Sequence, residues 1–249
     1  MKKLSLLILL PFLLFAGDRI FQISTIDALL AGLYDGLVSL EELRQKGDFG
    51  LGTFHGLDGE MVLLEGIFYQ VKADGKVYRP TGAMKSPFAA VIQFEAEEKL
   101  ELEKGVDFQS FEQIVDDFLP TFNIVYAFRL EGKFNYIKTR SVPQQQKPYP
   151  ALADIAATQP TFEYENIEGT IIGYRCPSFV KGINVPGYHL HFLSKDKKVG
   201  GHLLKFRVNS ALLEIDKIHG FEMELPRSSE FYRLNLAADK TEELKKVEK

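Results

Sequence analysis

The chain has 249 residues, of which 45% are hydrophobic and 26% charged, and it carries a net charge of −4. This composition is ordinary for a globular protein, and the length allows one large core or two modest ones. The acidic balance, without a long basic run, argues against a nucleic-acid-binding face. The single cysteine, Cys176, excludes an intramolecular disulfide, and we expect it to be a buried, inert thiol.

Residues 1–17 have the composition of a secretory leader. Two lysines precede the apolar stretch 4–15, and the small residues Ala16 and Gly17 follow it. A basic region, a short apolar region and a possible cleavage point predict a signal peptide, and therefore export to the periplasm or the medium. The stretch is short for a transmembrane helix, but an uncleaved leader that anchors the protein to a membrane is the alternative.

The chain after the leader begins with two predicted helices. Thr25 precedes apolar residues at helical spacing, and Ser39 with Glu42 forms a capping box for a helix over 40–46. Short apolar runs separated by Glu-Gly and Asp-Gly turns then predict an antiparallel meander. Its strands are expected at 60–64, 67–71 and 76–78, and further strands are expected at 89–94 and 99–102.

A third helix is expected over 108–118, because apolar residues recur there at helical spacing until Pro120 ends the pattern. Two strand-like runs follow, at 123–130 and 133–139, with Glu-Gly between them. The Glu-Gly pair predicts a turn and therefore another hairpin.

The stretch 141–150 contains three prolines and predicts a crossover between two domains, residues 18–150 and the β-rich residues 151–249. In the second domain we expect a short helix at 151–158, strands at 161–166, 168–175, 212–218 and 221–225, and a solvated tail at 241–249. The predicted fold is α+β, with two mainly antiparallel or mixed β-sheet halves and helices at their periphery.

Three of the five histidines fall within fourteen residues. His189 and His191 form an H-x-H pair, so in a strand both imidazoles point to one face. The polar stretch 193–198 predicts a turn that brings His202 back across from His191. Three neutral imidazoles can hold a Zn²⁺-type ion and leave a coordination position open. Scattered surface histidines on an ordinary hairpin would have the same spacing.

Two other polar residues are candidates for chemistry. Glu60 follows an Asp-Gly turn and begins a strand, so its carboxylate is expected at the rim of the sheet. Arg140 lies where a strand meets the proline-rich crossover, and its planar guanidinium suits a carboxylate substrate. An exposed glutamate and a surface arginine at strand ends are the alternatives.

Several motifs, taken in order, carry a resemblance to a known family. They are Gly52-Thr53-Phe54, Leu57-Asp58-Gly59-Glu60, Arg140-Ser141-Val142-Pro143, Pro148-Tyr149-Pro150, Glu168-Gly169-Thr170, the stretch 184–192 and Gly200-Gly201-His202. The ordered set resembles the alpha-acetolactate decarboxylases over essentially the whole chain after the leader. The resemblance implies a zinc-dependent carboxy-lyase that converts 2-acetolactate, a small 2-hydroxy-3-keto acid, to acetoin and CO₂ on the route towards butanediol.

The resemblance also implies roles for individual residues. The implied zinc ligands are His189, His191 and His202. The implied catalytic residues are Glu60, Arg140, Thr53 and Glu248, the last from a tail that folds back to the metal, with Glu242 or Glu243 as alternatives. The family's two-domain α+β homodimer, with the metal site between sheets, agrees with the predicted architecture. No stable membrane association is expected after signal cleavage.

Two rival interpretations fit the same histidines. An H-x-H pair with a distal histidine and a glutamate also describes cupin-like dioxygenases or isomerases, which would be distinguished by iron and oxygen consumption. A non-catalytic exported zinc-binding protein would keep the histidines without turnover.

Overall fold

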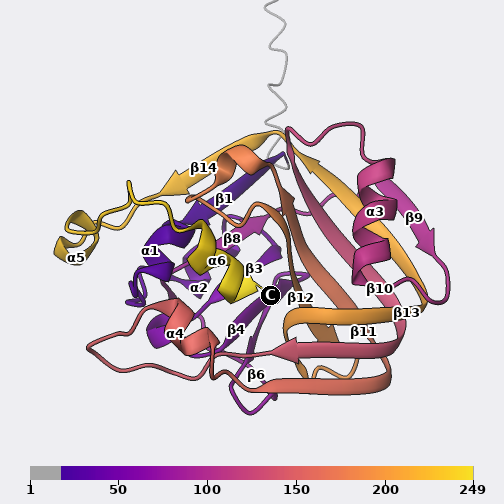
Figure 1. The fold of residues 1–249 in the computed structure, drawn as a ribbon, viewed down its shortest axis with the longest axis horizontal. Helices are drawn as coiled ribbons and strands as arrows, with labels where there is room; N and C mark the ends of the chain where they lie inside the picture. Colours follow the sequence, from indigo (N-terminus) through magenta and orange to yellow (C-terminus); the bar gives the residue numbers. More distant parts are fainter. Residues whose placement is uncertain (1–17, 249) are drawn as a thin grey trace, which may run out of the picture.

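The computed structural model describes residues 18–248, so the predicted leader lies outside the described residues. Two β-sheets form the body of the molecule, and short helices lie around them (Figure 1). The predicted α+β class, with two sheet halves and peripheral helices, is confirmed. Within residues 18–248, no helix is both long and apolar enough to cross a membrane.

The first sheet has seven strands and is open at both edges. In spatial order these are β14 (Gly220–Glu224), β1 (Arg19–Ile23), β8 (Ala89–Ile92), β3 (Phe49–Thr53), β4 (Glu60–Leu64), β5 (Ile67–Val71) and β6 (Val77–Tyr78). All neighbours are antiparallel except β1 and β14, which run parallel. The predicted meander is therefore confirmed for β4, β5 and β6, and β14, from near the end of the chain, extends the sheet at β1. The strand predicted at 99–102 lies in the second sheet.

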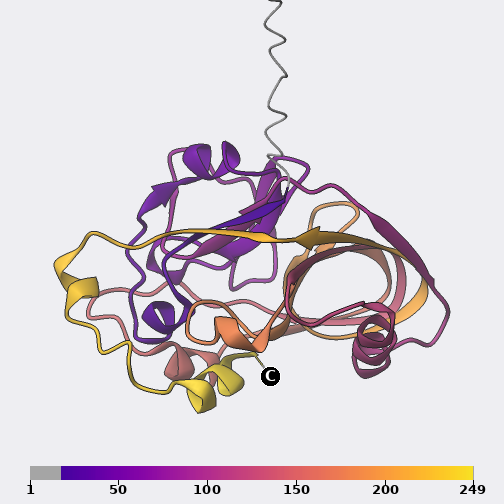
Figure 2. The ribbon, with the colours of Figure 1, turned by 90° about the horizontal axis from the view of Figure 1, so that it is seen from above.

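The second sheet has five strands, four of which close into a ring (Figure 2). The order is β10 (Val125–Arg140), β11 (Thr161–Cys176), β12 (Gly187–Ser194), β13 (Gly200–Ile218) and β9 (Glu98–Leu102), and β10 also pairs with β13. Closure leaves these four strands with no free edge between them. We call this the closed sheet and the seven-stranded one the open sheet.

The predicted hairpin at residues 123–139 is wrong, because β10 is one continuous strand. Gly132 lies in its middle, where a Cβ atom would stand 2.3 Å from the Ser210 carbonyl oxygen of β13. The glycine therefore allows close approach of two strands and does not make a turn. The two strands predicted at 161–175 are likewise one strand, β11, in which Asn166 has a φ of 50°.

The helices are short, and most begin at the residues that the sequence indicates. They are α1 (Ile26–Leu30), α2 (Leu40–Arg44), α3 (Phe108–Phe118), α4 (Leu152–Ala156), α5 (Ser229–Tyr232) and α6 (Thr241–Glu248), with 3₁₀ turns η1 (His55–Leu57) and η2 (Ser178–Val180) and a small sheet of β2 (Val38–Ser39) and β7 (Lys85–Ser86). Thr25 caps α1, and Ser39 with Glu42 forms the predicted capping box of α2.

The tail predicted to be solvated is instead the helix α6, which packs against α4. Val247 is buried in an apolar cluster with Leu152 and Ile155 of α4 and with residues of α1. The alternation of charges on α6 conceals one apolar side, which the sequence reading overlooked. This correction matters for the site, because Glu248 follows Val247 directly.

The two sheets pack face to face through one apolar cluster. Phe49 and Val62 of the open sheet meet Ile172 and Tyr174 of the closed sheet, and all four are buried. The Tyr174 hydroxyl also donates a hydrogen bond of 3.1 Å to the Ala90 carbonyl. This packing fixes the distance between side chains that the two sheets contribute to a common site.

The sheets do not divide at residue 150. Strands β9 and β10 precede it and lie in the closed sheet, whereas β14 follows it and lies in the open sheet. The boundary predicted at residue 150 therefore does not coincide with the division between the sheets, and the two domains 18–150 and 151–249 stay a prediction.

Candidate active site

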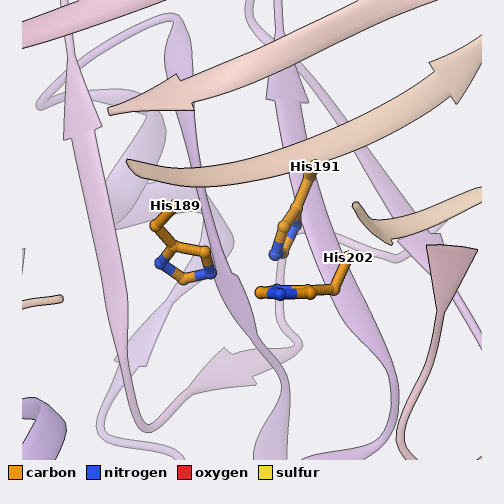
Figure 3. A group of neighbouring side chains, drawn as sticks. All are labelled: His189, His191 and His202. Carbon is orange, nitrogen blue, oxygen red and sulfur yellow. The ribbon is translucent and has the colours of Figure 1, made fainter. Parts of the chain in front are cut away.

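Three histidines of the closed sheet point into one space (Figure 3). His189 and His191 lie two residues apart on β12, so their rings share a face, while Leu190 between them enters the apolar core. The pairing of β12 with β13 sets His202 directly opposite His191. The ring centroids are 5.1 to 5.4 Å apart. The predicted hairpin is therefore present, and the three imidazole rings converge as predicted.

The three imidazoles are buried and neutral. Burial lowers the pKa of His189 to about 3 and also lowers the pKa of His191 and His202, because the charged form loses its solvation. The positive Arg140 nearby acts in the same direction. Neutral imidazole is the form that binds a metal ion.

The arrangement fits a metal ion. One ligand nitrogen from each ring lies within 4.8 Å of the others. Nδ1 of His191 lies 2.9 Å from the Met61 carbonyl oxygen, which can only accept, so Nδ1 carries the proton and Nε2 is free to bind. Nδ1 of His189 is buried and has no hydrogen-bond partner among residues 18–248. An unpartnered nitrogen of this kind is costly to bury unless something binds it.

The open sheet contributes Glu60, at the start of β4. Its Oε2 lies 3.6 Å from Nε2 of His191. Thr53 pairs with Glu60 across β3 and β4, and its hydroxyl donates a 2.7 Å hydrogen bond to the Gly59 carbonyl. Gly59 has a φ of 88°, and a Cβ there would lie 2.2 Å from the Val71 carbonyl oxygen. Thr53 and Gly59 thus set the turn that positions the Glu60 carboxylate.

Arg140 ends β10, opposite His202 on β13. It is buried, and its Nε has no hydrogen-bond partner among the described residues. The next residue, Ser141, donates a 2.7 Å hydrogen bond to the Val71 carbonyl, which ties the strand end to the open sheet. Burial lowers the pKa of Arg140, while Glu248 and Glu60 oppose that shift. The guanidinium therefore faces the site with donors available.

Glu248 enters the site from α6. Its Oε2 lies 3.7 Å from Nε2 of His202, whereas Glu242 and Glu243 lie farther back on the helix and pair with lysines. Burial raises the pKa of Glu248 to about 7 and the pKa of Glu60 to about 8, although Arg140 opposes both shifts. Two carboxyl groups therefore lie within 4 Å of the histidines, Glu60 beside His191 and Glu248 beside His202.

These side chains line one cavity of about 50 Å³. All seven residues predicted for the site line it: Thr53, Glu60, Arg140, His189, His191, His202 and Glu248. Apolar residues form much of the remaining wall, including Leu57, Phe88 and Leu152, and Gln159 adds a further polar group. The sequence analysis did not assign Phe88, Leu152 or Gln159 to the site, since nothing in their local sequence separates them from core or loop residues.

Comparison with known proteins agrees with this geometry. Residues 20–238 match the family model described as alpha-acetolactate decarboxylase. The alpha-acetolactate decarboxylase of Methanosarcina mazei is 47% identical over 234 residues, which is 94% of this chain and 81% of that protein. That of Methylococcus capsulatus is 44% identical over 230 residues, 92% of this chain and 88% of that protein. The crystal structure of alpha-acetolactate decarboxylase from Bacillus subtilis strain 168 aligns with a TM-score of 0.90 at 34% identity, covering 92% of this chain and 99% of that one.

Proposed function

This chain belongs to the alpha-acetolactate decarboxylase family and is a carboxy-lyase, and we propose that it releases CO₂ from 2-acetolactate with a zinc ion held by its three buried histidines. The observation that carries the proposal is the convergence of His189, His191 and His202 beside Glu60 and Arg140 in one cavity.

The histidines would hold the ion as neutral ligands, with Glu248 beside His202 as a further group on the metal side of the cavity. When bound, the zinc ion would supply positive charge where negative charge develops on the substrate oxygens, without the thiolates that would neutralise it. The closed sheet fixes the ligand spacing in advance, because β12 and β13 are paired at the histidines.

Arg140 would orient the substrate. Its guanidinium can donate two parallel hydrogen bonds to a carboxylate, and its unpartnered Nε is a donor that the protein itself does not use. The bond between C2 and the carboxylate carbon then breaks, CO₂ leaves, and the electron pair stays on the substrate as an enediolate. Arg140 would stabilise the carboxylate before this step and the developing charge during it.

Glu60 would deliver the proton that completes the reaction. The enediolate needs one proton at C2, the carbon that lost CO₂, to become acetoin. Glu60 lies 3.6 Å from His191 and lines the cavity, so it can hold a proton at the reacting centre. Solvent would return the proton to the carboxylate after each turnover.

The apolar part of the wall would exclude water around the reacting atoms. Leu57, Phe88 and Leu152 face the cavity, and such a surface suits the two methyl groups of 2-acetolactate. Exclusion of water also strengthens the interactions of Arg140 and Glu60 with the developing charge.

The pathway, oligomeric state and location of the enzyme are also part of the proposal. We propose that its product acetoin enters the butanediol route, that the chain works as a homodimer, and that the leader exports it. These three statements rest on the family and on residues 1–17 of the sequence.

One experiment tests the core of the proposal. The purified protein is incubated with racemic 2-acetolactate, acetoin is measured before and after treatment with a chelator, and bound metals are measured by mass spectrometry. We expect about one zinc per chain, acetoin formation that needs no oxygen, and recovery of activity when zinc is restored. Full activity in a preparation free of transition metals would overturn the proposal.

A further inference from the structure

Two exposed phenylalanines line a hollow near the point where residue 18 enters the fold, and a third, Phe122, directly precedes Asn123 of the same hollow. Phe122, Phe179 and Phe221 are 49%, 69% and 40% exposed. Phe179 and Phe221 line one open hollow of about 230 Å³, whose other apolar residues are Ile124, Val125, Pro177, Val180, Ile183 and Ile218. We call Phe122, Phe179, Phe221 and this hollow the leader-side face. Apolar patches of this kind on a folded protein commonly mark an interaction surface.

The ends of several elements meet at this face. Arg19 of β1 pairs with Gly220 of β14, and Val125 of β10 pairs with Ile218 of β13. Figure 1 shows these strand ends and η2, which contains Phe179, along the upper edge of the molecule. Asp18 itself contacts the rim, since its carboxylate accepts a 2.8 Å hydrogen bond from the backbone N–H of His219.

The sequence just before Asp18 identifies a partner for the face. Residues 4–15 are almost entirely apolar, and only two residues, Ala16 and Gly17, separate Phe15 from Asp18. The three residue-to-residue steps from Phe15 to Asp18 span at most about 10 Å. Whenever the stretch 4–15 is held in a bilayer, Asp18 is therefore held within about 10 Å of that bilayer, and with it the rim of the hollow at His219. Exposed phenylalanines at that distance can bury their rings at the lipid interface.

We propose that the leader-side face lies on the lipid bilayer for as long as residues 1–17 remain attached. The leader supplies the tether, and the three phenylalanines orient the folded enzyme on the membrane surface. No residue of the leader-side face lines the active-site cavity, whose wall is formed in part by α1, α4 and α6. The bilayer in this orientation therefore covers a face that contributes no residue to the cavity wall.

The absence of tryptophan from the sequence makes a direct test possible. The variant Phe179→Trp places a single indole on the leader-side face. The matched control Tyr232→Trp places it on α5, away from that face, at a position of nearly equal exposure, 71% against 69%. Each full-length chain is synthesised in a cell-free system with and without phosphatidylcholine vesicles. Intact mass verifies that residues 1–17 are present, and acetoin formation verifies the fold.

The proposal predicts that vesicles shift the emission of the Phe179→Trp chain to shorter wavelength, and that brominated phosphatidylcholine quenches it. The Tyr232→Trp chain should show neither effect. Equal spectra of Phe179→Trp with and without vesicles would overturn the proposal, as would an equal shift at both positions. A shift that grows with protein concentration in the absence of vesicles would assign the face to a second copy of the chain instead.

A second tryptophan position tests whether the shift at residue 179 is only a local effect of that substitution. Phe221→Trp lies on β14, across the hollow from Phe179, and should show the same shift and the same quenching. A shift at residue 179 alone would mean that η2 binds lipid by itself and that the face as a whole does not, which also contradicts the proposal.

Discussion

The closed sheet and the open sheet contribute to the site in different ways. The closed sheet supplies three histidines from a single hairpin, where strand pairing alone fixes their spacing. The open sheet supplies Glu60, and its place beside His191 depends on how two separate sheets pack. The three candidate metal ligands are local in sequence, whereas the position of Glu60, the proposed proton donor, depends on the tertiary structure.

One hydrogen bond within the site links a histidine of the closed sheet to the open sheet. The His191 ring donates from Nδ1 to the carbonyl oxygen of Met61, which follows Glu60 in β4. The same imidazole therefore belongs to the closed sheet by its backbone and is oriented by the open sheet. Substitutions in the two sheets should separate metal binding from turnover.

The largest effect is expected from His191→Ala. Loss of a ligand should remove the bound metal and lower kcat/KM by more than about 10³-fold, since stabilisation of developing charge is usually the largest contribution to catalysis. Metal content and acetoin formation are measured on the same sample. His55→Ala, at an exposed histidine, is the matched control and should keep both. Full activity of a metal-free His191→Ala protein would contradict the assignment.

Glu60→Gln should distinguish most clearly between the contributions of the two sheets, metal binding by the closed sheet and turnover by the open sheet. The amide keeps the shape of the side chain but cannot deliver a proton, so kcat should fall by about 10²- to 10⁴-fold while the metal stays bound. Glu65→Gln, at the exposed turn that ends the same strand, should leave kcat unchanged. If Glu60→Gln raises only KM, the proton must come from another group.

Arg140→Lys tests the guanidinium that β10 of the closed sheet contributes to the site. Lysine keeps the positive charge but loses the planar fork, so kcat/KM should fall by about 10- to 100-fold without loss of metal. Arg19→Lys, at an exposed arginine of the open sheet, is the control. Steady-state kinetics with 2-acetolactate provide the measurement, and an Arg140→Lys enzyme with unchanged kcat/KM would show that a point charge suffices.

A smaller effect is expected in the tail. Glu248→Gln should weaken retention of the metal by about tenfold, as loss of a group beside a ligand typically does. Dialysis against a graded series of chelator concentrations measures this retention. Glu242→Gln on the same helix, exposed and paired with Lys245, should have no effect. Equal loss in both variants would point to unfolding of α6 and not to the Glu248 carboxyl.

The smallest effect on activity is expected at the join between the sheets, where a substitution should change stability instead. Burial raises the pKa of Asp216, on β13, to about 7 from about 3.9 in an unfolded chain, although it accepts a hydrogen bond from the Glu95 N–H. The folded protein therefore keeps this proton between about pH 4 and pH 7, and the free energy of unfolding falls as pH rises through that window. Asp216→Asn cannot ionise, so from about pH 5 to about pH 8 it should gain up to about 3 kcal/mol relative to the original chain. Urea denaturation at the two pH values measures this, and an unchanged difference would place Asp216 in contact with solvent.

The parts of the molecule that depend on local signals could be predicted from the sequence. The capping box of α2, the apolar spacing of α3 and the H-x-H pair each specify their element within a few residues, and all are present. The residues proposed for the site also come together in one cavity. Their roles in catalysis stay predictions until the variants above are measured.

The parts that depend on distant segments could not be predicted. The Glu131-Gly132 pair has the chemistry of a turn, but Gly132 is needed because Ser210, far along the chain, approaches it closely. The pairing of β10 with β13, which closes the sheet, likewise joins segments with no shared local signal. The burial of Val247 depends on α4, so α6 reads as a polar tail until its partner is known.

The position of Glu248 has a practical consequence for anyone who produces this enzyme. Its side chain lines the cavity from the last turn of α6. A purification tag or fusion partner attached beside Glu248 would add bulk next to the cavity and would strain that turn. Recombinant material should therefore carry its handle away from α6.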